Sequence, residues 1–171
     1  MTRKSIVCLF PVLLFFSSVF SQPNNLEENR PVVLNGFEYG YIIRNEQVKT
    51  TKNDEYARFE LSFYLTNKSG CTKLYADRAG FLSDENPNLL ATFNCSNANG
   101  KRLTSKSGMV RARDFFVNAK VNIAGKESLQ SVKAGFIFRN GETLKSNIIV
   151  LLPAGERPQI TIMQNNLPEL H

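Results

Sequence analysis

The side chains that carry out catalysis in most enzymes are scarce in this chain. Its only histidine is His171, the last residue, where no neighbouring element holds it in position. Most Ser-His-Asp and Cys-His arrangements are disfavoured, because both need a positioned imidazole. Glu38, Glu60 and Asp114 remain, and glycosidases do use two carboxyl groups at a fixed separation. Exposed strand faces carry such residues in any protein, so we interpret them as solvated and expect a protein that is not an enzyme and needs no cofactor.

Oxygen ligands that would suit calcium occur in residues 84–88, which read Asp-Glu-Asn-Pro-Asn. Calcium loops also need a glycine at the sixth position and a distal bidentate glutamate, and Leu89 stands where that glycine would be. Asp, Asn and Pro are also the residues of ordinary surface turns. No histidine lies near Cys71 or Cys95, which disfavours zinc as well. We therefore expect no metal site.

Cys71 and Cys95 are instead predicted to form a disulfide. Residues 1–21 have the features of a cleaved secretory signal, because Arg3 and Lys4 precede an apolar run that is too short to cross a bilayer. Two cysteines remain after cleavage, and an even number behind an export signal points to an oxidising compartment. We expect a secreted protein of the periplasm, the cell surface or the extracellular space, without a transmembrane segment in the mature chain. Two unpaired thiols are the alternative.

One run of basic residues suggests a ligand. Five Lys and Arg side chains come within 13 residues without an acid among them: Lys101, Arg102, Lys106, Arg111 and Arg113. If they share a face, they would attract the phosphate, sulfate or uronate groups of an anionic glycan or a lipid headgroup. A solvated edge strand that its charges protect from aggregation is the alternative. Nucleic acid is disfavoured, because no aromatic residues interleave the run and the mature chain carries a net charge of only +4.

Sugar contacts of two other kinds are conceivable. Tyr39 and Tyr41, or Tyr56 and Tyr64, are spaced to stack on a sugar, but the chain has no Trp and cross-strand packing explains the tyrosines as well. Glycosylation sequons begin at Asn67 and Asn94, and they would matter only in a eukaryotic secretory pathway.

Strands must position these side chains, because no segment shows helical periodicity beyond one or two turns. The clearest strand lies within residues 55–66. There, five apolar residues alternate with more polar ones: Ala57, Phe59, Leu61, Phe63 and Leu65. Alternation predicts one buried and one solvated face. Residues 37–44 alternate in the same way, and the turn residues 50–54 would join the two strands in a hairpin.

The second half of the chain holds three further strand signals. Apolar residues alternate along 115–123 and predict another inward face. Asn140-Gly141 follows the next apolar strand and predicts a hairpin, because type I′ turns need positive φ at both positions. Residues 148–152 are apolar at every position, consistent with a strand that is covered on both sides.

Seven to nine short strands separated by turn residues predict an all-β fold with a single antiparallel β-sandwich of the immunoglobulin or fibronectin kind. A true immunoglobulin domain is disfavoured by the absence of Trp and by the 24-residue spacing of the cysteines, and a small β-barrel is the alternative. The sandwich would span 35–164, between a flexible N-terminal arm at 22–34 and a C-terminal tail at 165–171.

The function that fits these features best is that of an exported, non-enzymatic binding or structural module. Free strand edges can add a strand from a partner, which favours interaction with another envelope or extracellular protein. The first alternative is a binder of anionic glycan or lipid through residues 101–113. The second is a hydrolase that uses carboxylates.

Overall fold

The computed structural model describes four ranges of the chain: residues 24–50, 55–77, 86–99 and 107–170. Every regular element in these ranges is a β-strand, and no helix occurs there. The described residues therefore contain no helix that is long and apolar enough to cross a membrane. The predicted signal segment, residues 1–21, lies outside the described ranges.

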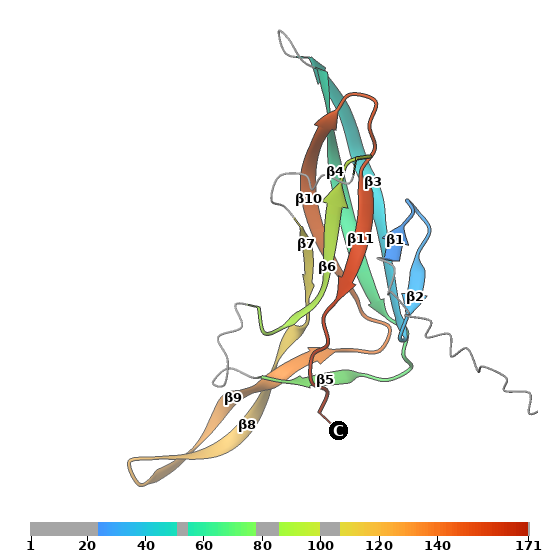
Figure 1. Cartoon of the computed structure of the whole chain (residues 1–171). Helices are drawn as coiled ribbons and strands as arrows, with labels where there is room; N and C mark the ends of the chain where they lie inside the picture. Colours follow the sequence, from blue (N-terminus) through green and yellow to red (C-terminus); the bar gives the residue numbers. More distant parts are fainter. Residues whose placement is uncertain (1–23, 51–54, 78–85, 100–106, 171) are drawn as a thin grey trace, which may run out of the picture.

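The described strands form three antiparallel sheets (Figure 1). The first has the order β1-β11-β6-β7, formed by Asn24–Leu26, Gln159–Gln164, Leu89–Ser96 and Gly108–Arg111. The second has the order β10-β4-β3-β2, formed by Thr143–Pro153, Glu55–Asn67, Phe37–Thr50 and Val32–Leu34. The third has the order β5-β9-β8, formed by Lys73–Ala76, Lys126–Phe138 and Arg113–Ile123. The predicted all-β class is confirmed, and the sheets are not closed into the barrel that was the alternative.

Most of the core lies between the first two sheets, and the third sheet contributes Tyr75, Phe136 and Phe138 to it. Phe63 of β4 stacks on Phe93 of β6, with ring centroids 4.7 Å apart, and Tyr39 of β3 packs against the same Phe93 ring. The glycine at position 108 lets β7 approach closely, because a Cβ there would lie 2.2 Å from the Phe63 ring. Aromatic packing between facing strands thus holds these two sheets together.

The strand with the clearest sequence pattern is the centre of the second sheet. The five alternating apolar residues of β4 are at most 1% exposed, as predicted. The expected hairpin with β3 also forms, in a register that runs from Phe37 opposite Asn67 to Thr50 opposite Glu55. A bulge lies between Ile43 and Asn45. Of the predicted turn, residues 51–54 lie outside the described ranges.

The expectation that residues 148–152 are covered on both sides is wrong. Val150 and Leu152 are buried, but Ile149 is 43% exposed and Leu151 is 52% exposed. The reason is that β10 lies at the margin of the second sheet, where the core covers only one of its faces. The continuous apolar run at residues 148–152 therefore lies in a strand that has one buried and one solvated face.

The hairpin predicted at Asn140-Gly141 is also wrong. The turn itself forms, with φ of 74° at Gly141 and a hydrogen bond from Glu142 N to Arg139 O. However, β9 pairs with β5 and β8, whereas β10 pairs with β4. The turn thus carries the chain from the third sheet to the second.

Both ends of the described chain pair with strands of the sheets. Residues 24–34 belong to the N-terminal segment that the sequence predicted to be flexible. They contain β1, which pairs with β11, and β2, which pairs with β3. The C-terminal tail runs along β5, where Ala76 N donates to Pro168 O and Leu170 N donates to Leu74 O. The tail therefore covers the edge of β5 that faces away from β9.

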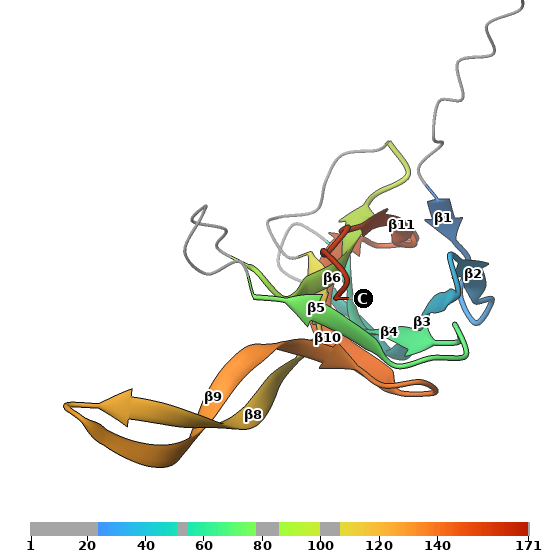
Figure 2. The ribbon, with the colours of Figure 1, turned by 90° about the horizontal axis from the view of Figure 1, so that it is seen from below.

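Two strands of the third sheet, β8 and β9, extend away from the first two sheets as a long hairpin. β8 and β9 pair from Arg113 opposite Ile137 to Ile123 opposite Lys126, whereas β5 pairs only with residues 135–138 at the base of β9. Figures 1 and 2 show the two strands projecting away from the other two sheets. Residues 116–133 of this hairpin are named the arm.

Candidate interaction surface

Solvent reaches both faces of the arm. Phe116 is 55% exposed, Ile123 54% and Leu129 70%. The prediction that the apolar face of residues 115–123 packs inward is therefore wrong, because no described strand of the body accompanies the arm beyond Gly135. The alternation correctly predicts a strand with two unlike faces, but the apolar face is not covered.

Cross-strand pairing divides the arm into two faces. Residues directly opposite each other share a face. The apolar face consists of four pairs, Val117 with Val132, Ala119 with Gln130, Val121 with Ser128 and Ile123 with Lys126. The opposite face consists of the pairs Phe116 with Lys133, Asn118 with Ser131, Lys120 with Leu129 and Asn122 with Glu127. The stripe of apolar side chains is thus continuous along β8 only. On β9, neither face of residues 126–131 has an apolar residue at every second position.

A glycine shapes the base of the arm. Gly135 has φ of 153°, and a Cβ there would lie 2.2 Å from the carbonyl oxygen of Tyr75 on β5. The register also shifts at this level, so that Ala134 is an extra residue between the pairs made by Phe115 and Phe116. Bulges bend and twist a strand pair. The hairpin therefore changes direction where it leaves β5.

Ion pairs fasten this base. The Lys133 Nζ atom lies 3.1 Å from Asp77 Oδ2 and 3.0 Å from Asp114 Oδ1, and it sits 4.2 Å from the centre of the Phe136 ring. The hydrogen bond to Asp114, helped by the one to Asp77, raises the pKa of Lys133 above its usual value. The lysine thus links the end of β5, β8 and β9 at the base of the arm.

The structure places the two described members of the predicted basic run in different sheets. Arg111 ends β7 in the first sheet and donates to Asn86 Oδ1, whereas Arg113 begins β8 in the third sheet. Arg113 Nε lies 2.6 Å from Glu142 Oε1, so a carboxylate already balances its charge. Between the two arginines, Ala112 is buried. The other members of the run, Lys101, Arg102 and Lys106, lie outside the described residues.

The disulfide predicted between Cys71 and Cys95 does not form. Cys71 is exposed in the link between β4 and β5, whereas Cys95 is buried on β6 opposite Ile160. Cys95 belongs to the hydrophobic core, whereas the Cys71 sulfur lies at the surface beside the Ser69 hydroxyl, so the two side chains occupy different environments.

Of the candidate catalytic carboxylates, Glu38 and Glu60 lie far apart on neighbouring strands, and Asp114 pairs with Lys133. Glu38 lies opposite Thr66 and binds Lys68, whereas Glu60 lies six positions before Thr66 on β4 and binds Arg58. Six strand residues span about 20 Å, well beyond the roughly 5–9.5 Å between the two carboxyl groups of glycosidases. In the segment considered for calcium, Asn86 accepts from Arg111, and Asp84 and Glu85 lie outside the described residues.

Tyr39, Tyr41 and the sequon at Asn67 do not support sugar contacts, whereas Tyr56 and Tyr64 are half-buried. Tyr39 and Tyr41 are 2% and 5% exposed, so neither ring is available as a stacking platform. Burial raises the pKa of Tyr39 to about 12. Asn67 is fully buried, and its Nδ2 atom donates to Cys71 O and Phe138 O, so this amide is a structural link rather than a glycan acceptor. Asn94, in the second sequon, is half-buried.

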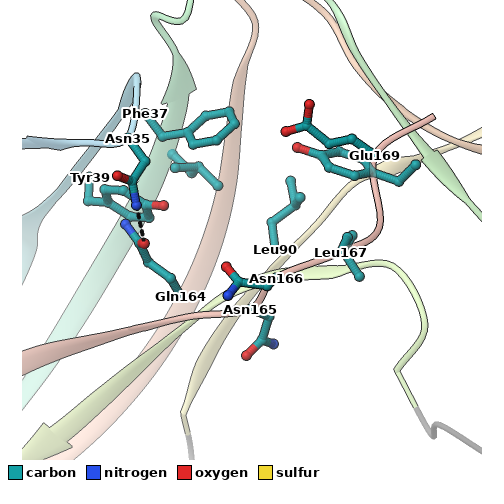
Figure 3. A pocket seen from close by; sticks show the side chains of 11 residues that line it. Asn35, Phe37, Tyr39, Leu90, Gln164, Asn165, Asn166, Leu167 and Glu169 are labelled. Carbon is teal, nitrogen blue, oxygen red and sulfur yellow. Dashed lines mark hydrogen bonds between the residues drawn. The ribbon is translucent and has the colours of Figure 1, made fainter. Parts of the chain in front are cut away.

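A hollow of about 150 Å³ lies where β3, β6 and the C-terminal tail meet (Figure 3). The side chains of Asn35 and Gln164 meet at its wall through a hydrogen bond of 3.0 Å, and the Gln164 Nε2 atom is buried without a partner. Ligand pockets usually have volumes of about 300–1,000 Å³. The hollow therefore suits a few water molecules better than an organic ligand, and the arm remains the better candidate.

Comparisons with protein-family models, with curated proteins and with solved structures gave no match to this chain. The candidate surface therefore rests on geometry alone. Sequence reasoning identified β8 as a strand with two unlike faces, but the arm was missed. The available signal was β9, whose residues 126–131 include one apolar side chain, Leu129, and so do not fit a strand that is packed on a core.

Proposed function

We propose that this protein is an exported, non-enzymatic module that binds another protein of the envelope or extracellular space through its arm. The carrying observation is the exposure of apolar side chains on both faces of a projecting ribbon, with Ile123 at 54% on the apolar face and Leu129 at 70% on the opposite face. An isolated two-stranded hairpin is at best marginally stable in water. A partner that pairs with the arm, or covers it, would supply the burial that the body does not.

In this proposal the first two sheets act as a β-sandwich body that displays the arm. The stacked Phe63 and Phe93 rings between facing strands support a rigid body. The Lys133 ion pairs and the bend at Gly135 support an arm with a defined direction. A preoriented element loses less conformational entropy when it binds than a mobile loop does. Export rests on the signal features of residues 1–21.

The geometry favours this function over the two alternatives. A hydrolase that uses Glu38 and Glu60 would need carboxyl groups far closer than about 20 Å. Of the basic run, the two members that the structure describes are both engaged within the chain, Arg111 with Asn86 and Arg113 with Glu142. Neither alternative has a described surface as distinctive as the arm.

A capture experiment with an arm-trimmed variant tests the proposal. Replacing residues 117–132 by Asn-Gly would join Phe116 to Lys133, which already lie opposite each other, through a tight turn. This variant keeps Lys133 and its ion pairs. The tagged mature protein should recover a partner in a constant ratio from a native envelope or extracellular fraction, and the trimmed variant should not.

A matched control removes a different apolar surface. The double variant Ile149→Ser with Leu151→Ser changes two exposed side chains on β10 and should capture as the wild type does. Equal capture by the wild type and the arm-trimmed variant would rule out the arm as the binding element.

A further inference from the structure

We propose that the partner of the arm is a second copy of this chain, which pairs antiparallel along the outer edge of β8. The inference rests on the proposed binding role of the arm. In such a dimer a two-fold axis relates the two β8 strands, and the two third sheets join into one sheet of six strands, β5-β9-β8 followed by β8-β9-β5 of the second copy.

Among the described edge strands, β8 is the long one whose outer edge has no described partner strand. The marginal strands β1, β2, β5 and β7 have three or four residues, and the tail covers β5. β10 is long, but β7 lies beside it and Pro153 ends it. β8 has 11 residues without a proline. A long unpaired edge presents N–H and C=O groups that pair with other strands unless charges, prolines or bulges protect them. Within residues 116–123 of β8, Lys120 is the one charged residue.

The residues of β8 favour one register. With the axis at Ala119, Val117 lies opposite Val121 of the second copy, and Phe115 lies opposite Ile123 of the second copy. On the other face, Lys120 then lies opposite Asn118 of the second copy. An axis at Lys120 would place two ammonium groups opposite each other, which destabilises a strand pair.

An axis at Asn118 is the nearest alternative. It would place Arg113 opposite Ile123 of the second copy, and so would interrupt the apolar face that the Ala119 register joins. Apolar pairs directly opposite each other stabilise antiparallel strands. The register about Ala119 is therefore the one to test.

The charges of the arm are compatible with an antiparallel partner. The distal end carries Lys126 and Glu127, whose charges cancel, whereas the base carries Asp77 and Asp114 around Lys133, a net charge of −1. Lys120 lies one residue from the proposed axis and faces Asn118 of the second copy, so this pairing places no two lysines directly opposite each other.

A membrane fits the arm less well than a second copy does. A strand that crosses a bilayer alternates apolar and polar residues along its length. Residues 126–131 of β9 place Lys126, Ser128 and Gln130 on one face and Glu127, Leu129 and Ser131 on the other, so neither face is apolar.

The test is a charge exchange across the predicted axis. Sedimentation velocity of the full mature chain over a concentration series should show a dimer for the wild type. Val117→Lys with Val121→Lys places like charges opposite each other twice, and should weaken the dimer on the order of tenfold or more. Val117→Glu with Val121→Lys places opposite charges there, and should restore it. Within one chain these positions are about 13 Å apart, so the two new charges do not pair internally.

A second measurement locates the axis. In a Cys71→Ser background, Ala119→Cys should form an intermolecular disulfide under mild oxidation, because the two introduced thiols meet at the axis. Val48→Cys, at a position that is 61% exposed on β3, should not. Thermal unfolding of each variant shows whether the body is folded.

Two results would overturn the inference: a wild type that stays monomeric at every concentration, or a lysine double variant that still forms the wild-type dimer. A monomeric wild type whose arm still captures a different protein would leave the proposed function standing and refute only the second copy. Capture that does not depend on the arm would refute both.

Discussion

Phe63 and Phe116 show how the same side chain has different roles in two strands of this protein. Phe63 is fully buried between Phe93, Tyr41 and Gly108, whereas Phe116 is 55% exposed at the start of the arm. A large aromatic residue in a strand therefore does not by itself identify the core. The neighbouring sheet decides whether the ring contributes to stability or remains available to a partner.

The two phenylalanines form a matched pair of substitutions. Phe63→Ala should lower the free energy of unfolding by about 3–5 kcal/mol, because it leaves a cavity between two sheets. Phe116→Ala should change it by no more than about 0.5 kcal/mol, since its ring is solvated in the monomer. Urea unfolding at a protein concentration low enough to keep the chain monomeric measures both. Losses of similar size would show that the inner and outer faces are assigned wrongly.

Buried tyrosines should make the fold sensitive to alkali. Burial raises the pKa of Tyr39 from 10.0 to about 12, and it raises the pKa values of Tyr41 and Tyr75 as well. The folded chain thus retains these protons more tightly than the unfolded chain does. Their contribution to stability is complete below pH 10, the unfolded value, and is lost as the pH rises toward the folded value of about 12.

The unfolding free energy should therefore fall steeply between pH 10 and pH 12, together with the appearance of phenolate absorbance. Tyr39→Phe removes one of these protons and should make the fall shallower. Ionisation of all five tyrosines near pH 10 while the chain is still folded would contradict the burial of these rings.

At the scale of elements, β4 and β8 explain what the sequence can and cannot predict. Both alternate apolar and polar residues, and both are strands with two unlike faces. Alternation predicts that the faces differ, but whether another sheet covers the apolar face depends on where the chain goes afterwards. β4 has strands on both sides and a sheet above it, whereas β8 follows a change of sheet at Ala112.

Two glycines test the junction between arm and body. Gly135→Ala should destabilise the pairing of β9 with β5, because the new Cβ would lie 2.2 Å from Tyr75 O and φ there is 153°. Gly125→Ala, at the end of the hairpin, also has positive φ, but no atom lies within 4 Å of the new Cβ. It should cost only about 1 kcal/mol of backbone strain. Urea unfolding should show a clearly larger loss for Gly135→Ala, and equal losses would mean that β5 does not cross the base of the arm as described.

At the scale of the whole molecule, local sequence patterns did not predict which strands pair within each sheet. Asn140-Gly141 predicted the turn but not that its two strands join different sheets. The cysteine count predicted a disulfide between Cys71 and Cys95, but the fold buries Cys95 on β6 and leaves Cys71 exposed in the link between β4 and β5. Such features depend on sheet order, which the hydrophobic pattern of single strands does not encode.

The candidate site was unpredictable for the same reason. Sequence reasoning looked for it among charges and carboxylates, which turn out to lie in different sheets or in local ion pairs. The arm becomes visible only when β8 and β9 are seen to extend beyond β5. Its polar β9 is the one local feature that could have indicated a ribbon without a core.

Backbone hydrogen exchange tests the central claim, that the arm is the binding element, most directly. The mature protein would be compared in three states: dilute, concentrated, and dilute with a native envelope or extracellular fraction. Peptides from residues 113–137 should exchange rapidly in the dilute state and gain protection in the concentrated state, while peptides from β4 remain equally protected throughout. Protection of the arm only with the native fraction would identify a different partner. Rapid exchange of the arm in all three states would contradict a binding role.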